Sequence, residues 1–85
     1  MLTRTERLAD RINLISTTTD ETYACIATLG PNRWIVREGT NDYIQGLEAN
    51  EYPSARDAGL AAETAMLMYR RSQHGHGIGP DYSLR

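Results

Sequence analysis

The chain has one cysteine, no lysine and no phenylalanine among its 85 residues. A lone Cys25 excludes an internal disulfide, and its place in an apolar alternating segment indicates a buried, reduced thiol. We therefore expect a reducing compartment, the cytoplasm of a bacterial host. The nine basic residues are all arginine. Together with the absence of phenylalanine, this is typical of GC-rich coding DNA and favours a bacterial or phage origin.

Long apolar runs are also missing. No stretch approaches the roughly 18 residues that a membrane span needs, and the charged residues 1–7 do not have the pattern of a secretory signal. Apolar residues make up 40% and charged residues 24% of the chain, a balance typical of one globular domain with one core. The net charge of −2 is too small to predict a nucleic-acid partner.

Motifs for catalysis and cofactor binding are absent from the sequence. There is no phosphate-binding loop, dinucleotide fingerprint or zincin helix, and one cysteine cannot found a zinc ribbon. His74 and His76 could offer two imidazoles to a metal, but two ligands on a glycine-rich segment make a weak site, and solvated histidines are the favoured interpretation. We expect a non-enzymatic protein without a cofactor.

The N-terminal segment, residues 3–15, predicts an amphipathic helix. Leu8, Ile12 and Ile15 recur at the i, i+4, i+7 spacing that places apolar side chains on one helix face. Thr3 has a glutamate three residues further on, which is the spacing of a capping box. This helix is expected at the side of the domain or behind it.

Residues 22–38 predict a β-hairpin. Polar and apolar side chains alternate on both sides of the Gly-Pro-Asn turn at residues 30–32, whose residue types suit tight turns. Trp34 and Val36 are expected on one face of the second strand. Residues 43–47 could add a short third strand, and a loop with a helical turn is the competing interpretation.

Residues 54–72 predict the longest helix. Ser54 and Asp57 have capping-box spacing, and strong helix formers follow them. A wide face rich in alanine suits close packing on a sheet, whereas Leu60 and Leu67 point to nearly the opposite side. These two leucines are expected to lie under the N-terminal helix, or to face a partner, or to be exposed to solvent.

The expected architecture is α+β. An N-terminal helix is followed by an antiparallel β-hairpin or three-stranded sheet and by a long C-terminal helix packed on the sheet. Residues 1–73 form the single domain, and residues 74–85 form a flexible glycine-rich tail.

The candidate contact residues come from three places. Arginines alternate on one face of the second hairpin strand and could meet phosphate or acidic protein surface. Tyrosines flank a polar loop, where they suit an interface, and the two leucines above could join two copies into a homodimer. The partner-binding candidates are Arg33, Arg37, Tyr43, Tyr52, Leu60 and Leu67.

The layout from Tyr23 to Arg71 resembles the three-stranded-sheet-plus-helix DNA-binding domains of plant ethylene-response factors and of phage integrase arms. The resemblance lies in the Gly-Pro-Asn turn, the Arg-Trp-Ile-Val-Arg strand at 33–37 and the segment 52–58 that opens an alanine-rich helix. It implies a small DNA-binding module that reads DNA through the open sheet face with Arg33 and Arg37. The net negative charge and the absent lysines disfavour this alternative.

A hairpin followed by a helix rich in alanine and methionine is also similar to small phage-encoded inhibitors of bacterial defence, including anti-CRISPR proteins. That resemblance implies a short non-catalytic protein, encoded by a phage or mobile element, that blocks a host protein or protein–nucleic-acid complex by binding it. This is the first functional hypothesis, and the DNA-binding module is the second.

Overall fold

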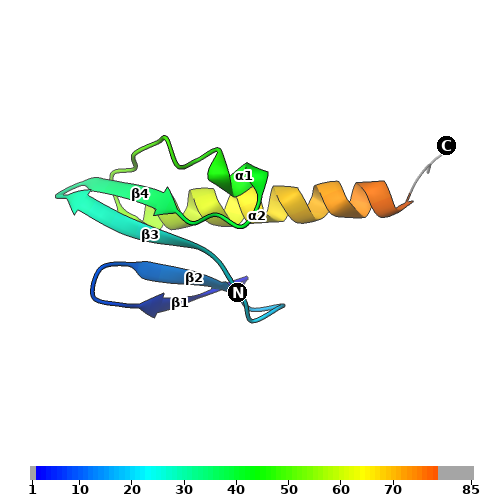
Figure 1. Ribbon diagram of the computed structural model, residues 1–85, viewed down its shortest axis with the longest axis horizontal. Coiled ribbons are helices and arrows are strands. Elements are labelled where there is room, and N and C mark those ends of the chain that lie inside the picture. Colours follow the sequence, from blue (N-terminus) through cyan, green and yellow to red (C-terminus); the bar gives the residue numbers. More distant parts are fainter. Residues whose placement is uncertain (1, 79–85) are drawn as a thin grey trace.

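Figure 1 shows the computed structural model of the chain. The structure describes residues 2–78, with side chains as far as Gln73. The elements in chain order are β1 (Thr3–Arg7), β2 (Ile12–Ser16), β3 (Thr22–Gly30), β4 (Arg33–Arg37), α1 (Asp42–Gln45) and α2 (Ala55–Ile78). The four strands form one antiparallel sheet in the order β1-β2-β3-β4. The α+β class and the long C-terminal helix are thus confirmed.

The N-terminal helix was a wrong prediction, because residues 3–16 form the antiparallel hairpin β1–β2 instead. Its turn is closed by a hydrogen bond from the Leu8 amide to the Arg11 carbonyl at 2.8 Å. The Leu8–Ile12–Ile15 spacing fits a helix, but Ile12 and Leu14 also alternate as a strand requires. Pairing of β2 with β3 decides between the two, since packing commonly overrides weak local propensity.

The predicted β3–β4 hairpin is confirmed, and its turn follows the expected chemistry. Asn32 has a positive φ of 59° after Pro31, a conformation that asparagine tolerates. The pairing of β2 with β3 shifts register between Leu14 and Ile15, which leaves Tyr23 as an extra residue. Tyr23 and its neighbour Ala24 therefore both reach the hydrophobic core, as the bulge turns one side chain toward the face of the other.

Of the two interpretations of residues 43–47, the loop with a helical turn is confirmed and the third strand is not, because this segment begins within the short helix α1 (Asp42–Gln45). Asn41 caps α1 by accepting a hydrogen bond from the Ile44 amide at 3.1 Å. Ile44 is completely buried and belongs to the hydrophobic core. The sheet has four strands because the predicted hairpin, β3–β4, is joined by β1 and β2 from the N-terminal segment.

Helix α2 packs on β3 and β4, as Figure 1 shows, with the hairpin β1–β2 to one side of it. Ser54 accepts a hydrogen bond from the Asp57 amide at 3.0 Å, which confirms the predicted helix start. The buried residues of its packing face are Ala58, Ala62, Ala65 and Met66. Small side chains let the helix lie close to the sheet, as the alanine-rich face predicted.

Helix α2 continues to Ile78, beyond the predicted end at residue 72. The first five residues of the predicted tail, 74–78, are thus helical, and residues 79–85 lie outside the described residues. The flexibility of the tail stays a prediction. Within residues 2–78, no helix is both long and apolar enough to cross a membrane.

Candidate protein-binding groove

A groove of about 360 Å³ lies between the N-terminal hairpin and α2. Its floor is apolar, formed by Ile12, Leu14 and Ile26 from β2 and β3. Leu60 of α2, with 49% of its surface exposed, stands in one wall, and β1 provides the other. We call this hollow the β1–α2 groove. Its lining residues are Thr3, Thr5, Arg7, Ile12, Leu14, Ile26, Ala55, Arg56, Gly59, Leu60 and Glu63.

One end of the β1–α2 groove is closed by hydrogen bonds. The Thr3 hydroxyl donates to Glu63 at 2.6 Å and lies 2.7 Å from the Tyr23 hydroxyl. Since the single proton of Thr3 goes to the carboxylate, the Tyr23 hydroxyl must donate to Thr3. Burial raises the pKa of Tyr23. These contacts join β1, β3 and α2, and they hold the β1 wall of the groove in place.

The other end of the groove is cationic. Arg7 of β1 and Arg56 of α2 both line it, and both are exposed. Within the described part of the chain, Arg4, Arg11 and Arg33 form ion pairs, and Arg7 and Arg56 do not, nor do Arg37, Arg70 and Arg71. Arg7 and Arg56 differ from the other unpaired arginines in lining the groove. Two positive charges on opposite walls of an apolar groove favour a negatively charged group between them.

A second hollow of about 350 Å³ adjoins the cationic end. It shares Arg7 and Ile12 with the β1–α2 groove, and Leu8 and Trp34 also line it. Leu8 is 45% exposed, and Trp34 is half-buried against the core. Apolar surface therefore continues from Leu60 past the arginines toward the tips of both hairpins.

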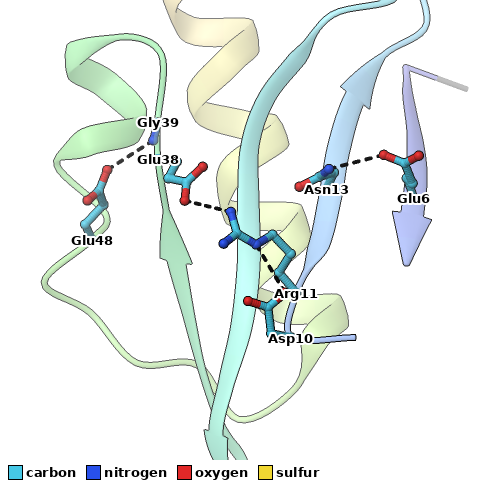
Figure 2. A network of polar contacts seen from close by, with 7 residues as sticks. All are labelled: Glu6, Asp10, Arg11, Asn13, Glu38, Gly39 and Glu48. Carbon is cyan, nitrogen blue, oxygen red and sulfur yellow. Dashed lines mark hydrogen bonds and ion pairs between the residues drawn. The ribbon is translucent and has the colours of Figure 1, made fainter. Parts of the chain in front are cut away.

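On the opposite face of the sheet several polar side chains bond to one another, as Figure 2 shows. Arg11 reaches across β3 to Glu38, with 2.7 Å between guanidinium and carboxylate, and also contacts Asp10 at 3.4 Å. Asn13 donates to Glu6 at 3.2 Å on the same face. Cys25 is 2% exposed beside this network, and burial, followed by the charge of Glu38, raises the pKa of its thiol.

Of the predicted arginine contacts, Arg33 is already paired within the chain. Its guanidinium donates two hydrogen bonds to Glu51, each 3.0 Å long. This pairing lowers the pKa of Glu51 and cancels the positive charge offered to a phosphate. Arg37 is exposed and borders the small hollow over Cys25 together with Asp10, Arg11 and Glu38.

The two predicted tyrosines lie in different environments. Tyr43 is exposed on α1 and packs edge-to-face on Tyr69 of α2, with ring centroids 6.3 Å apart. Tyr52 is half-buried and forms a backbone bridge with Trp34, through hydrogen bonds of 2.8 and 2.7 Å. Tyr52 is thus near Arg33, whereas Tyr43 is held against α2.

The two leucines also have different roles. The N-terminal helix that was expected to cover them is absent from the described residues. Leu60 is exposed in the groove, but Leu67 is half-buried and packs against the hydrophobic core. The six predicted contact residues therefore do not form one surface, and Leu60 alone among them lines the β1–α2 groove.

Sequence reasoning missed Arg7, Arg56 and Gly59 as groove residues. Arg7 lies in the segment that was predicted as a helix and that forms β1 instead, and Arg56 lies in the first turn of α2 with no pattern around it that indicates binding. Gly59 was the one available sequence signal of the groove. An isolated glycine among good helix formers weakens a helix, so its presence indicates a packing or functional role.

Among residues with described side chains, no three His, Cys, Asp or Glu lie together as a metal site requires; His74 and His76 fall outside those residues. Comparison with protein families, with curated proteins and with solved structures finds no match to this chain. The fold therefore defines the structural class of this chain: a small α+β protein with a four-stranded antiparallel meander and one long helix, which borders the β1–α2 groove.

Proposed function

We propose that this chain is a non-enzymatic protein that acts by binding another protein through the β1–α2 groove. The observation behind the proposal is the exposed Leu60 in a wall of that groove, beside two arginines that lack ion-pair partners among the described residues. An apolar hollow with a few charged groups at its edge is the usual form of a binding site.

The finer form of the proposal is that the bound protein belongs to a bacterial defence complex of the CRISPR type, which the chain inhibits. Its support is the resemblance noted in the sequence, a hairpin followed by a helix rich in alanine and methionine, to small phage-encoded inhibitors. Under this proposal the chain acts in the bacterial cytoplasm and competes for a surface that the complex needs.

The alternative, DNA binding through an arginine-bearing sheet face, has weaker support. Of its two predicted arginines, Arg33 is paired with Glu51, and only Arg37 has no ion pair among the described residues. Arg11 and Arg4 are paired with Glu38 and Asp20. A DNA-binding face needs such charges free to displace counterions from phosphates. Steep salt-dependent binding to duplex DNA, lost on replacing Arg33 and Arg37, would favour this alternative instead.

Photo-crosslinking tests the binding proposal. A benzophenone amino acid replaces Leu60 in one variant and Leu29 in a control, since these leucines are 49% and 50% exposed and only Leu60 lines the groove. We expect a protein adduct in bacterial cells from position 60 alone. The adduct is identified by mass spectrometry and its affinity measured, with at least a tenfold loss expected for Leu60→Glu and none for Leu29→Glu. Equal effects at both positions would reject the groove.

A phage-plaquing assay tests the finer proposal. Bacteria with a CRISPR-type system express wild type, Leu60→Glu or Leu29→Glu and are challenged with a targeted phage. Wild type and Leu29→Glu should restore plaque formation, and Leu60→Glu should not. Full immunity in the presence of soluble wild type, across systems of several types, would reject defence inhibition and leave the binding proposal to the crosslinking result.

A further inference from the structure

We infer that the β1–α2 groove binds an acidic amphipathic α-helix of the partner protein, lying on β1 alongside α2. The inference rests on the proposed function and names the partner's chemistry. It is drawn from the geometry of the uncovered sheet face, the layer in which Leu60 and Gly59 lie, and the charges of Arg7 and Arg56.

The exposed part of the sheet beside α2 is β1, because Ile12 and Leu14 of β2 are only 6% and 2% exposed. A helix with its side chains is about 10–12 Å wide, and strands lie about 4.8 Å apart, so one helix covers roughly two strands. Helix α2 packs on β3 and β4, and the side of the sheet next to it, over β1, holds the groove. Packed helices lie about 8–10 Å apart, which places a second helix beside α2 above β1.

The position of Leu60 favours a helix over an added strand. A strand joining the free edge of β1 would lie in the plane of the sheet, a further 4.8 Å or so away from α2. Leu60, Arg56 and Gly59 belong to α2, one layer above that plane. Only an element lying on the face of β1 contacts both these residues and Thr5.

Gly59 supports a close approach at the same place. A Cβ atom at this position would meet no atom within 4 Å, so no steric contact of the chain itself requires a glycine there. Glycine inside a helix is unfavourable relative to alanine, and its use is to let another backbone come close. Gly59 lines the groove, where a neighbouring helix would pack against it.

The charges select an acidic partner over a second copy of this chain. Arg7 and Arg56 face the groove from both walls, while Glu63 at the far end already accepts a hydrogen bond from Thr3. In a symmetric dimer residue i of one copy contacts residue j of the other, so the carboxylate of this groove that a second copy could bring to the arginines is Glu63, which Thr3 already engages. A carboxylate on the partner helix, by contrast, would lie between two guanidinium groups that can bind it in a bidentate manner.

The partner helix therefore has a recognisable pattern. Apolar side chains at i, i+3 or i+4, and i+7 would face Leu60 and the groove floor, as in other helix-in-groove complexes. A glutamate or aspartate would sit at the end nearest Arg7 and Arg56. About two turns of helix span the groove, because the seven residue-to-residue steps from Arg56 to Glu63 rise about 10 Å.

Selection from a peptide library tests the inference with the full chain as bait. The probe is a displayed 16-residue alanine-based helix with seven randomised positions on one face, set beside a matched library of extended hairpin peptides. We expect helical peptides with the pattern above to be enriched. Calorimetry should then show at least tenfold weaker binding to Leu60→Glu and to Arg56→Glu, and unchanged binding to Leu29→Glu.

Reversing the charges of the peptide and of Arg56 tests the predicted ion pair directly. Replacing the selected acidic residue by lysine should abolish binding to wild type and restore it for Arg56→Glu. Three selection outcomes would overturn the inference: enriched peptides without an acidic residue, preferential enrichment of extended peptides, or no enrichment at all. A dimer in light scattering that Leu60→Glu dissociates would also overturn it. In the first three cases a position-60 crosslink to another protein would still uphold the proposed function. If a helical peptide binds but no protein in bacterial cells is crosslinked from position 60, the proposed function fails, and the inference that the groove binds an acidic helix stands.

Discussion

The two halves of the sheet are covered to different degrees. Strands β3 and β4 lie under α2 and α1, and Val36 and Ile44 there are completely buried. In the other half, β1 is exposed along most of its length, whereas Ile12 and Leu14 of β2 are only 6% and 2% exposed and form part of the floor of the open groove. One half therefore stabilises the fold, and the other presents the surface on which we place function.

The largest effect expected is the loss of a buried side chain in the covered half. Ile44→Ala should lower the free energy of unfolding by about 2–5 kcal/mol, since it leaves a closed cavity in the core. Ile12→Ala is the matched control in the groove floor, and its cost should be smaller because the hollow there is already open. Urea denaturation measures both. Equal losses would contradict the contrast between the two halves.

Substitutions of the two leucines of α2 should likewise differ in their effect on the free energy of unfolding. Leu67→Glu places a charge against the hydrophobic core and should cost about 1–3 kcal/mol. Leu60→Glu changes an exposed side chain and should stay within about 0.5 kcal/mol. Thermal melting checks this, and a 1 kcal/mol change shifts the midpoint by about 4–8 °C at this chain length. A strongly destabilised Leu60→Glu would place Leu60 in the fold rather than in an interface.

Substitution of two glycines by alanine should change stability in opposite directions. Gly59→Ala should raise stability by about 0.5–1 kcal/mol, because the new methyl group enters open space. It should also weaken binding of the selected helix. Gly39→Ala should destabilise by about 1–3 kcal/mol, since its Cβ would lie 2.7 Å from Ile44 Cγ2. A Gly59→Ala variant that binds as well as wild type would argue against close helix approach.

The smallest effect expected is a loss of stability at alkaline pH. Burial raises the pKa of Cys25 and of Tyr23, so the folded chain keeps protons that the unfolded chain releases. Their contribution is fully present below about pH 8.5, where an unfolded thiol titrates, and is lost as pH rises through the folded values. Urea denaturation from pH 7 to 10 should show this decline, with a shallower slope in Cys25→Ala. An unchanged slope would mean that the thiol is solvated.

Local sequence signals predicted the covered half well. The Gly-Pro-Asn turn, the alternation around Trp34 and Val36, and the Ser54 cap each depend on neighbours in the chain. The structure contains the hairpin and the helix start that these signals predicted. The N-terminal hairpin was mispredicted because Leu8, Ile12 and Ile15 satisfy a helical period as well as a strand pairing. Only pairing with β3 resolves that ambiguity, and the partners lie further along the chain: Thr22 is 7 residues after Ile15, and Ile26 is 14 residues after Ile12.

The candidate site was less predictable than the fold. Leu60 was singled out because its side of the helix needed cover, and the structure leaves it exposed. Arg7 and Arg56 come together only when β1 lies beside α2, so neither stood out in the sequence. The hydrogen bonds from Tyr23 through Thr3 to Glu63 likewise depend on three elements meeting.

The sequence by itself thus determined the α+β class, the hairpin around residues 30–32, the long alanine-rich helix and the buried thiol. These follow from turn chemistry, side-chain period and capping, which act over a few residues. Tertiary structure decided that the N-terminus pairs as strands, that Leu67 is covered while Leu60 is not, and that Arg7 faces Arg56 across an apolar groove. Those features depend on which surfaces are left over once α2 has covered β3 and β4, and no local pattern contains that information.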